Sequence, residues 1–207
     1  MAKAYEDSLI EKTVRAMERK NYVLFRGNGQ VNIVYLEGMD KDGSPNGNRP
    51  NWFNDLRIAF TFQDNRPIIL GMWEATTEPG RRYTENPVAA GGAARIALNQ
   101  FSAWQVGMHR GDHEALIQTG GPVTVYRDLN EDYKRDGDRQ QSGFFGINQH
   151  WGYDLPVSDI GGASAGCLVG RSKAGHKEFM ALVKSDPRYK ADHGFVFTTA
   201  ILEAKDI

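Results

Sequence analysis

Short apolar runs, several with every second residue polar, fill the chain beyond residue 20 and constrain its fold more than any other feature. Alternation over four to eight residues is typical of a β-strand with one buried face. Glycine, proline, asparagine and aspartate separate the runs, as they do in turns. The runs that predict strands are 22–25, 30–36, 56–62, 67–75, 103–108, 115–118, 122–126, 143–148 and 194–202. We therefore expect a mainly β fold, a β-rich α+β domain built as a sandwich or barrel.

Two segments have helical periodicity instead, with apolar residues three or four positions apart. Residues 1–20 predict an amphipathic helix that packs on the domain, and the alternative is a separate role in binding a partner. Residues 172–184 predict a late helix with Ser172 at its N-cap, and Pro187 ends it. The rest of the chain, 21–207, then forms one domain.

The composition is that of a globular protein, with 40% hydrophobic and 25% charged residues among 207. Lysine plus arginine (25) and aspartate plus glutamate (26) nearly cancel, so no charge excess favours binding to nucleic acid or anionic membrane. No apolar run reaches the ~18 residues of a membrane span, and the N-terminus lacks the apolar stretch of a signal peptide. We expect a monomer that is made in the cytoplasm, without nucleic-acid partners or stable membrane insertion.

Cys167 is the only cysteine, so the chain forms no internal disulfide and this thiol needs an explanation. In Ser164-Ala165-Gly166-Cys167, small residues leave room for a substrate and for backbone N–H groups that face a reacting carbonyl. A thiol with a pKa of ~8.5 needs a base or a cation to react at neutral pH. His150, at the end of a predicted strand, could be that base. A buried, inert cysteine beside a structural histidine is the alternative, and spacing alone favours it.

The segment 144–171, which ends in GINQHWGYDLPVSDIGGASAGCLVGR, resembles the L,D-transpeptidase (YkuD-like) family. The family motif has a strand-terminal histidine, roughly fourteen residues, and then Ser-His-Gly-Cys. Here thirteen residues separate His150 from Ser164, and an Ile-Gly pair lies between them as in many members. A weaker similarity is WEATTEPGRRY at 73–83, which is similar to the family's strand followed by Thr-Pro-x-Gly-x-Phe. The likeness extends loosely over 56–202.

The chain departs from the family pattern in three places. Ala165 stands where most members have a second histidine, and Arg171 follows Cys167 by four residues instead of two. A Trp-Gly pair follows the strand-terminal histidine, where Gly-Thr or a serine pair is more usual. In these respects the chain is similar to divergent, phage-like members with the sequence SAGC.

The resemblance implies an L,D-transpeptidase-like β-sandwich or barrel and a cysteine-dependent enzyme without a cofactor. Cys167 would attack a peptide-bond carbonyl in a peptidoglycan stem, and His150 would take the thiol proton or hold the thiolate as an ion pair. The N–H groups of Gly166 and Cys167 would bind the oxyanion. Ser164 would hydrogen-bond near the thiol or only form the turn. Arg171 would bind a stem-peptide carboxylate, or it is a plain surface arginine.

Trp151 and Tyr153 could line the substrate groove, with aromatic core packing as the alternative. Transfer of the acyl group to water gives hydrolysis, and transfer to an amine gives a cross-link. A compact chain without a signal peptide favours an endolysin-like hydrolase of the cell wall that causes bacteriolysis, released by a holin if phage-encoded. True L,D-transpeptidation is the first alternative. A catalytically inactive structural or virion protein on the same fold is the second.

Two weaker patterns concern metals. His109 and His113 have the i, i+4 spacing of helical zinc sites, and with His150 and Cys167 they could supply a zinc ligand set. The strand-like flanks argue against a helix there. Carboxylates alternate along 128–138, as in calcium loops, but the full twelve-residue pattern is not met. We therefore predict no metal and a solvated acidic loop.

Overall fold

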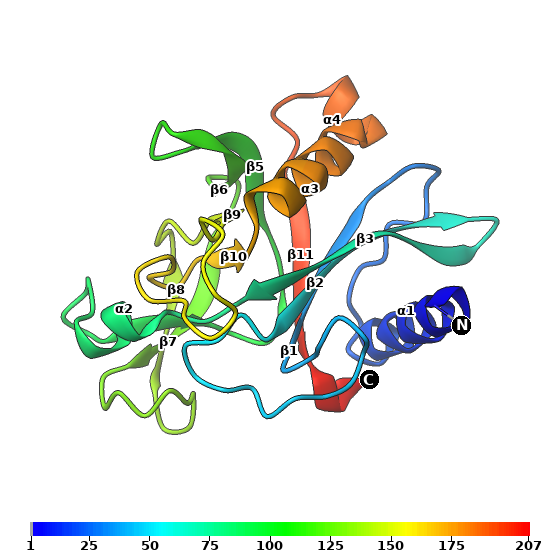
Figure 1. Cartoon of the computed structure of the whole chain (residues 1–207). Helices are drawn as coiled ribbons and strands as arrows, with labels where there is room; N and C mark the ends of the chain where they lie inside the picture. The colour runs from blue at the N-terminus through cyan, green and yellow to red at the C-terminus, as the bar shows by residue number, and fades with distance from the viewer. Residues whose placement is uncertain (1) are drawn as a thin grey trace.

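Strands form most of the regular structure in the computed structural model, which describes the backbone of residues 2–207 and side chains from residue 6 onward (Figure 1). Within that range eight strands close into a barrel in the order β1-β11-β5-β6-β9-β10-β3-β2, and β4-β7-β8 form a separate sheet. The barrel strands are β1 (Asn32–Glu37), β2 (Asp55–Gln63), β3 (Arg66–Thr76), β5 (Gln100–His109), β6 (His113–Gln118), β9 (Gln149–Trp151), β10 (Leu168–Gly170) and β11 (Phe197–Glu203). The separate sheet consists of β4 (Ala93–Ile96), β7 (Val123–Asp128) and β8 (Arg139–Gly143).

The helices are α1 (Ala2–Arg19), α2 (Arg81–Glu85), α3 (Lys173–Ser185) and α4 (Pro187–Ala191), followed by the 3₁₀ turn η1 (Ala204–Asp206). Ser172 caps α3, because its side chain accepts a hydrogen bond from the Gly175 N–H at 3.0 Å. Pro187 lies beyond the end of α3, as predicted, and also occupies the first turn of α4, where proline is favoured.

The largest apolar cluster joins the barrel to α3 and to the small sheet. Trp104 and Phe197 of the barrel, Phe179 of α3 and Val125 of β7 are all buried within it. A second cluster lies between α1 and the outer side of the barrel, where Ile10 and other apolar residues of α1 pack on β1, β2 and β11. The helix predicted at 1–20 therefore covers one side of the barrel.

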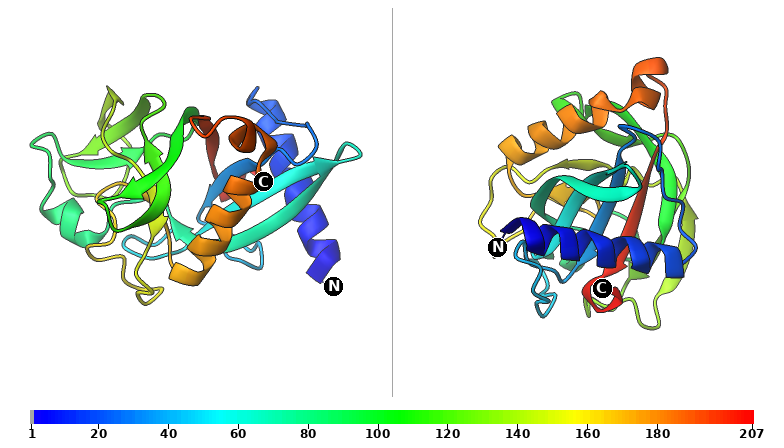
Figure 2. Two further views of the ribbon diagram at one scale, coloured as in Figure 1. Left: turned by 90° about the horizontal axis from the view of Figure 1, so that it is seen from above. Right: turned by 90° about the vertical axis from the view of Figure 1, so that its right-hand side faces the viewer.

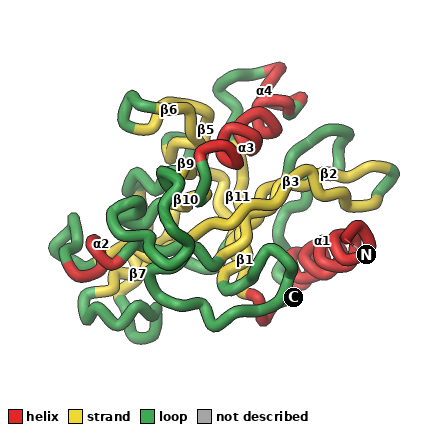
Figure 3. The backbone as a smooth tube through the Cα atoms, viewed as in Figure 1, coloured by secondary structure: helices red, strands yellow, loops and turns green. Residues whose placement is uncertain are grey.

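The elements are arranged at two ends of the molecule. In Figures 1 and 2, α1 and both termini lie at one end, and α2 with the small sheet lies at the other. Figure 3 shows that loops cross in front of β10. No helix in residues 2–207 is long and apolar enough to cross a membrane.

Two predicted strands are wrong, because side-chain amides take the place of a strand partner. Gln100 binds both the N–H and the carbonyl of Val23, so residues 22–25 run as an irregular segment. The Gln118 amide oxygen accepts the N–H groups of Phe145 and Ile147, so most of 143–148 is also irregular. Strand β8, which directly follows the predicted acidic loop 128–138, was not predicted and pairs with β7.

Buried ion pairs tie the small sheet to the barrel. Arg95 of β4 contacts Glu78, which follows β3, at 2.7 Å, and Asp128 of β7 at 3.4 Å. Arg135 pairs with Glu37 at the end of β1. Since ions buried this deeply need compensating charges, these contacts fix where the small sheet lies.

Candidate active site

Cys167 lies directly before β10 and lines a cavity of about 420 Å³. The wall of this cavity is built at the end of the molecule that carries α2 and the small sheet. Its lining includes Tyr83, Ala93, Ala94, His109, Phe145, Ile147, Asn148 and Ala165. The cysteine is thus within reach of a small ligand, as a nucleophile must be.

The turn before Cys167 is held by Ser164. Its buried hydroxyl accepts the Gly166 N–H at 3.1 Å and donates to the Cys167 carbonyl at 2.9 Å. Gly166 has a φ of +124°, and a Cβ there would lie 2.5 Å from the Ala94 carbonyl oxygen, so only glycine fits. Ser164 therefore acts as the turn former. Because the Gly166 N–H is already engaged, the Cys167 N–H is the better placed of the two predicted oxyanion donors.

The thiol is uncharged at neutral pH. The Asn148 N–H donates a hydrogen bond to Sγ at 3.4 Å, and the thiol donates in turn to the Gly146 carbonyl oxygen at 3.5 Å. Burial raises the pKa of Cys167 to about 11, while the Asn148 hydrogen bond and the charge of Arg110 act in the opposite direction. A nucleophilic role for Cys167 would therefore require a base to remove the thiol proton.

His150 is on β9, the parallel neighbour of β10, and pairs in register with Val169, two residues after Cys167. Its Nδ1 lies 2.7 Å from the Trp151 carbonyl oxygen, so the network assigns the proton to Nδ1 and leaves the lone pair of Nε2 free. Burial, with a smaller contribution from the neighbouring His109, lowers the pKa of His150 to about 3. His150 is therefore an oriented, neutral imidazole.

His109 stacks on His150 with 4.0 Å between ring centroids and lines the cavity itself. The Asn148 amide is oriented by the Gln118 N–H, which donates to its oxygen at 2.9 Å. Its nitrogen therefore donates to His109 Nδ1 at 3.0 Å, which places the His109 proton on Nε2. Burial lowers the pKa of His109 to about 4. With its lone pair engaged, His109 is less suited than His150 to accept a proton.

No hydrogen bond within the described residues joins Cys167 Sγ to either imidazole. Catalytic hydrogen bonds often form only when substrate binds, so His150 stays the candidate base although it makes no hydrogen bond to the thiol. Sequence reasoning did not assign Asn148 to the site, and it considered His109 only as a metal ligand. The one sequence feature that could have indicated Asn148 is its position two residues before His150 in the predicted motif.

Trp151 and Arg171 lie outside the Cys167 cavity. Trp151 stacks on His113 with 3.8 Å between centroids and lines a separate hollow of about 250 Å³ with His176. Arg171 forms an ion pair with Glu74 at 2.6 Å, so its charge is already compensated. Neither side chain lies where a substrate would meet the thiol.

Tyr153 is 39% exposed, and its ring centroid lies 6.2 Å from that of His150. It therefore stands beside His150, but it is not among the residues that line the Cys167 cavity. His176 of α3 is buried against Arg57.

The i, i+4 histidines lie on a hairpin and not on a helix. His109 and His113 are register partners across β5 and β6, and their ring centroids are 5.4 Å apart. Across residues 2–207, no three histidine, cysteine, aspartate or glutamate side chains are grouped so that they could hold a metal ion. The rings of His109, His113 and His150 instead contact one another, with centroids 4.0 to 6.0 Å apart.

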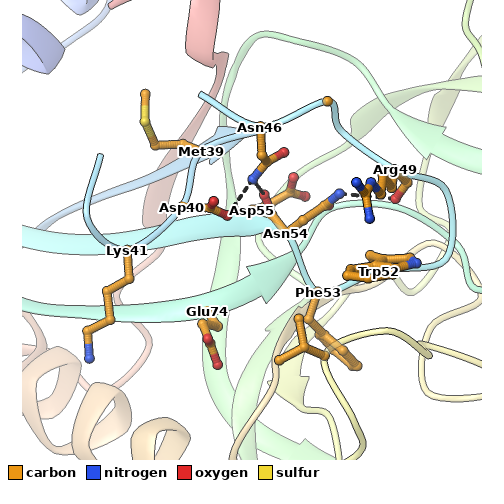
Figure 4. Close-up of a pocket in the computed structure, with 12 residues that line it drawn as sticks. Met39, Asp40, Lys41, Asn46, Arg49, Trp52, Phe53, Asn54, Asp55 and Glu74 are labelled. Atoms are coloured by element: carbon orange, nitrogen blue, oxygen red, sulfur yellow. Dashed lines mark hydrogen bonds between the residues drawn. The ribbon is translucent and has the colours of Figure 1, made fainter. Parts of the chain in front are cut away.

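A larger hollow of about 490 Å³ lies beside β2 and β3 (Figure 4). Asn46 spans it, donating to Asp40 at 2.7 Å and to the Asn54 carbonyl at 2.8 Å, and Arg49 lies over the Trp52 ring at 5.0 Å. Its lining holds neither the cysteine nor a histidine. The hollow is therefore not the site of thiol chemistry.

Comparison with known proteins adds no relative to these observations. No protein-family model matches the chain, and no curated protein matches it. The resemblance to L,D-transpeptidases therefore rests on the residues of 144–171 and of the weaker segment 73–83.

Proposed function

We propose that the protein is a cysteine-dependent hydrolase of peptidoglycan stem peptides, an endolysin-like enzyme on an L,D-transpeptidase-like fold. The observation that carries the proposal is the position of Cys167: the chain's one cysteine lines a ligand-sized cavity together with His109, whose ring stacks on the oriented imidazole of His150. A nucleophile, a base and a group that orients the base are the parts that covalent acyl transfer requires.

In the proposed reaction, the Cys167 sulfur attacks the carbonyl carbon of a stem-peptide bond while His150 Nε2 takes the thiol proton. The Cys167 N–H donates to the oxyanion. When the C–N bond breaks, the protonated imidazole gives that proton to the leaving amine, and a thioester remains. Water then attacks the thioester carbonyl while His150 takes a proton from it. When the C–S bond breaks, the imidazolium gives that proton to the sulfur and the thiol is restored. The overall result is addition of one water across the peptide bond.

The pKa values favour general-base catalysis over a preformed ion pair. The pKa of Cys167 is raised to about 11 and that of His150 is lowered to about 3, so proton transfer between them is unfavourable before substrate binds. The proton therefore moves as the S–C bond forms, when negative charge passes from sulfur to the carbonyl oxygen.

Digestion of defined muropeptides, read by mass spectrometry, tests the proposal. We expect products heavier by one water from the wild type, none from Cys167→Ala, and a loss of at least 100-fold in rate for His150→Gln. His193→Gln is the matched control, because His193 is exposed and lies outside the cavity. Amine-exchanged or cross-linked products would instead identify a transpeptidase. Absence of any product from the wild type would favour a structural protein that has lost the chemistry.

A further inference from the structure

The charged groups in the Cys167 cavity are all of one sign. Arg110 and Arg127 line it, and none of its lining residues is acidic. Arg127 is held against the wall, since its Nε donates to Gln141 at 2.9 Å and its guanidinium lies 4.7 Å from the Phe145 ring centroid. Arg110 is exposed and forms no ion pair with any of residues 2–207. A cavity with this charge favours an anionic ligand.

Arg110 is an unusual residue for its place in the backbone. It and Gly111 are the two central residues of the β-turn from His109 to Asp112 that connects β5 and β6, with φ values of +53° and +72°, and the Asp112 N–H bonds to the His109 carbonyl at 2.9 Å. Such turns favour Asn-Gly, because a side chain with positive φ is strained unless it is small and polar. The turn therefore does not explain why an arginine is present.

The position of Arg110 brings its charge close to the reacting groups. It follows His109 directly, and both residues line the cavity with Cys167. Its charge also acts on the pKa of Cys167, which it lowers, and on the pKa values of His109 and His150. A carboxylate bound by Arg110 would thus lie within a few atoms of the carbonyl that the thiol attacks.

We propose that the cavity selects acyl donors that carry a free carboxylate near the scissile bond, and that Arg110 is the residue that binds it. The donor class rests on the proposed function, in which the substrate is a peptide. Guanidinium binds carboxylate through two parallel hydrogen bonds, which an amidated donor cannot replace. Arg110 replaces Arg171 as the carboxylate-binding residue, since Arg171 is paired with Glu74.

Alkylation of Cys167 by two small reagents tests the charge without requiring catalysis. Iodoacetate carries a carboxylate and iodoacetamide is its neutral analogue, and the ratio of their rates cancels any change in the thiol pKa. We expect Arg110→Asn to lower the iodoacetate-to-iodoacetamide ratio about 3- to 10-fold, and Arg110→Lys to retain most of it. Arg66→Gln, at the exposed tip of the β2–β3 hairpin, is the matched control and should leave the ratio unchanged.

The asparagine variant suits the turn, so a lower ratio cannot be ascribed to unfolding if its melting temperature is at or above that of the wild type. The wild-type ratio should also fall toward that of the variant at 0.5 M salt, where exposed charges are screened. An equal ratio in the wild type and Arg110→Asn would overturn the proposal.

Paired stem peptides, with a free or an amidated carboxyl at the same residue, test selectivity. We expect Arg110→Asn to lower kcat/KM about 10-fold for the free acid and less than 2-fold for the amide. Equal wild-type kcat/KM for the two peptides would overturn the selectivity while the hydrolase function stands. A lowered alkylation ratio with no cleavage of either peptide would overturn the hydrolase function and retain Arg110 as an anion-binding residue.

Discussion

Cys167 and His150 have pKa values displaced in opposite directions, and both displacements favour the uncharged form. The alkylation rate of Cys167 by iodoacetamide should therefore rise about tenfold per pH unit from pH 7 to pH 10, because only the thiolate reacts. Mass spectrometry of the intact chain, in samples quenched at successive times, measures this rate. A rate that is already constant above pH 6 would show a preformed thiolate–imidazolium pair. Cys167→Ala should take up no label.

His176 illustrates a second effect of burial. It accepts a hydrogen bond from Arg57 at 3.4 Å, donates to the Glu114 carbonyl at 2.9 Å, and has a pKa lowered from 6.5 to about 3. Burial is the main cause, followed by the charge of Arg57. The unfolded chain binds the His176 proton more tightly than the folded chain does. The contribution of neutral His176 to the free energy of unfolding is therefore complete above pH 6.5 and is lost as the pH falls toward 3.

His176→Gln should reduce the acid sensitivity of the fold, because glutamine can make both hydrogen bonds and does not titrate. The loss of unfolding free energy between pH 7 and pH 5 should shrink by about 2 kcal/mol, one proton's contribution over that interval. Urea unfolding at the two pH values measures it. An unchanged loss would mean that His176 is protonated in the folded state. His193→Gln, on the exposed surface, is the control.

For single residues, the sequence could identify site residues that are close to Cys167 along the chain. It could not identify residues that strand pairing brings close to Cys167 in space. Cys167 and His150 could be predicted from the sequence because one motif contains both. His109 reaches the cavity from β5, through hairpin pairing with β6 and contact of β6 with β9. Arg171 meets Glu74, 97 positions earlier in the chain. Such partners depend on barrel order, which a local pattern does not contain.

Among the elements, the turn into β10 determines how the thiol is presented. Gly166→Ala would place a Cβ at positive φ and against the Ala94 carbonyl, so we expect a loss of about 1–3 kcal/mol in unfolding free energy. The alkylation rate should change as well, because the turn must shift. Gly47→Ala is the matched control, since nothing lies within 4 Å of the Cβ it would add. Equal melting temperatures for the two variants would contradict this account.

Element prediction succeeded where the alternation was long and failed where a pairing partner decided the conformation. The runs at 56–62 and 67–75 correspond to β2 and β3, which pair over most of their length. Strands β9 and β10 have three residues each and hold only through their neighbours. A run that short contains no period to detect. The polar strand β8, with sequence RQQSG, has no buried face to create alternation.

Across the whole molecule, the apolar cluster around α1 and the Cys167 cavity lie at opposite ends. The cluster around α1 shares no residue with the Cys167 cavity, and Figures 1 and 2 show α1 at the end away from α2. The cavity wall instead comes from α2, the small sheet and the β5–β6 turn, which the buried pairs of Arg95 tie to the barrel. Changes at α1 should therefore alter the free energy of unfolding without altering the thiol.

Ile10→Ala tests this separation. Ile10 belongs to α1 and is 1% exposed where the helix packs on the barrel. Its truncation should therefore lower the free energy of unfolding by about 2–5 kcal/mol through lost burial and a residual cavity. The iodoacetamide rate at Cys167 should stay within 1.5-fold of the wild type at 25 °C, where the variant remains folded. Lys12→Ala, on the exposed face of α1, should change neither quantity. A several-fold change in thiol reactivity with Ile10→Ala would show instead that packing of α1 reaches the cavity through the barrel.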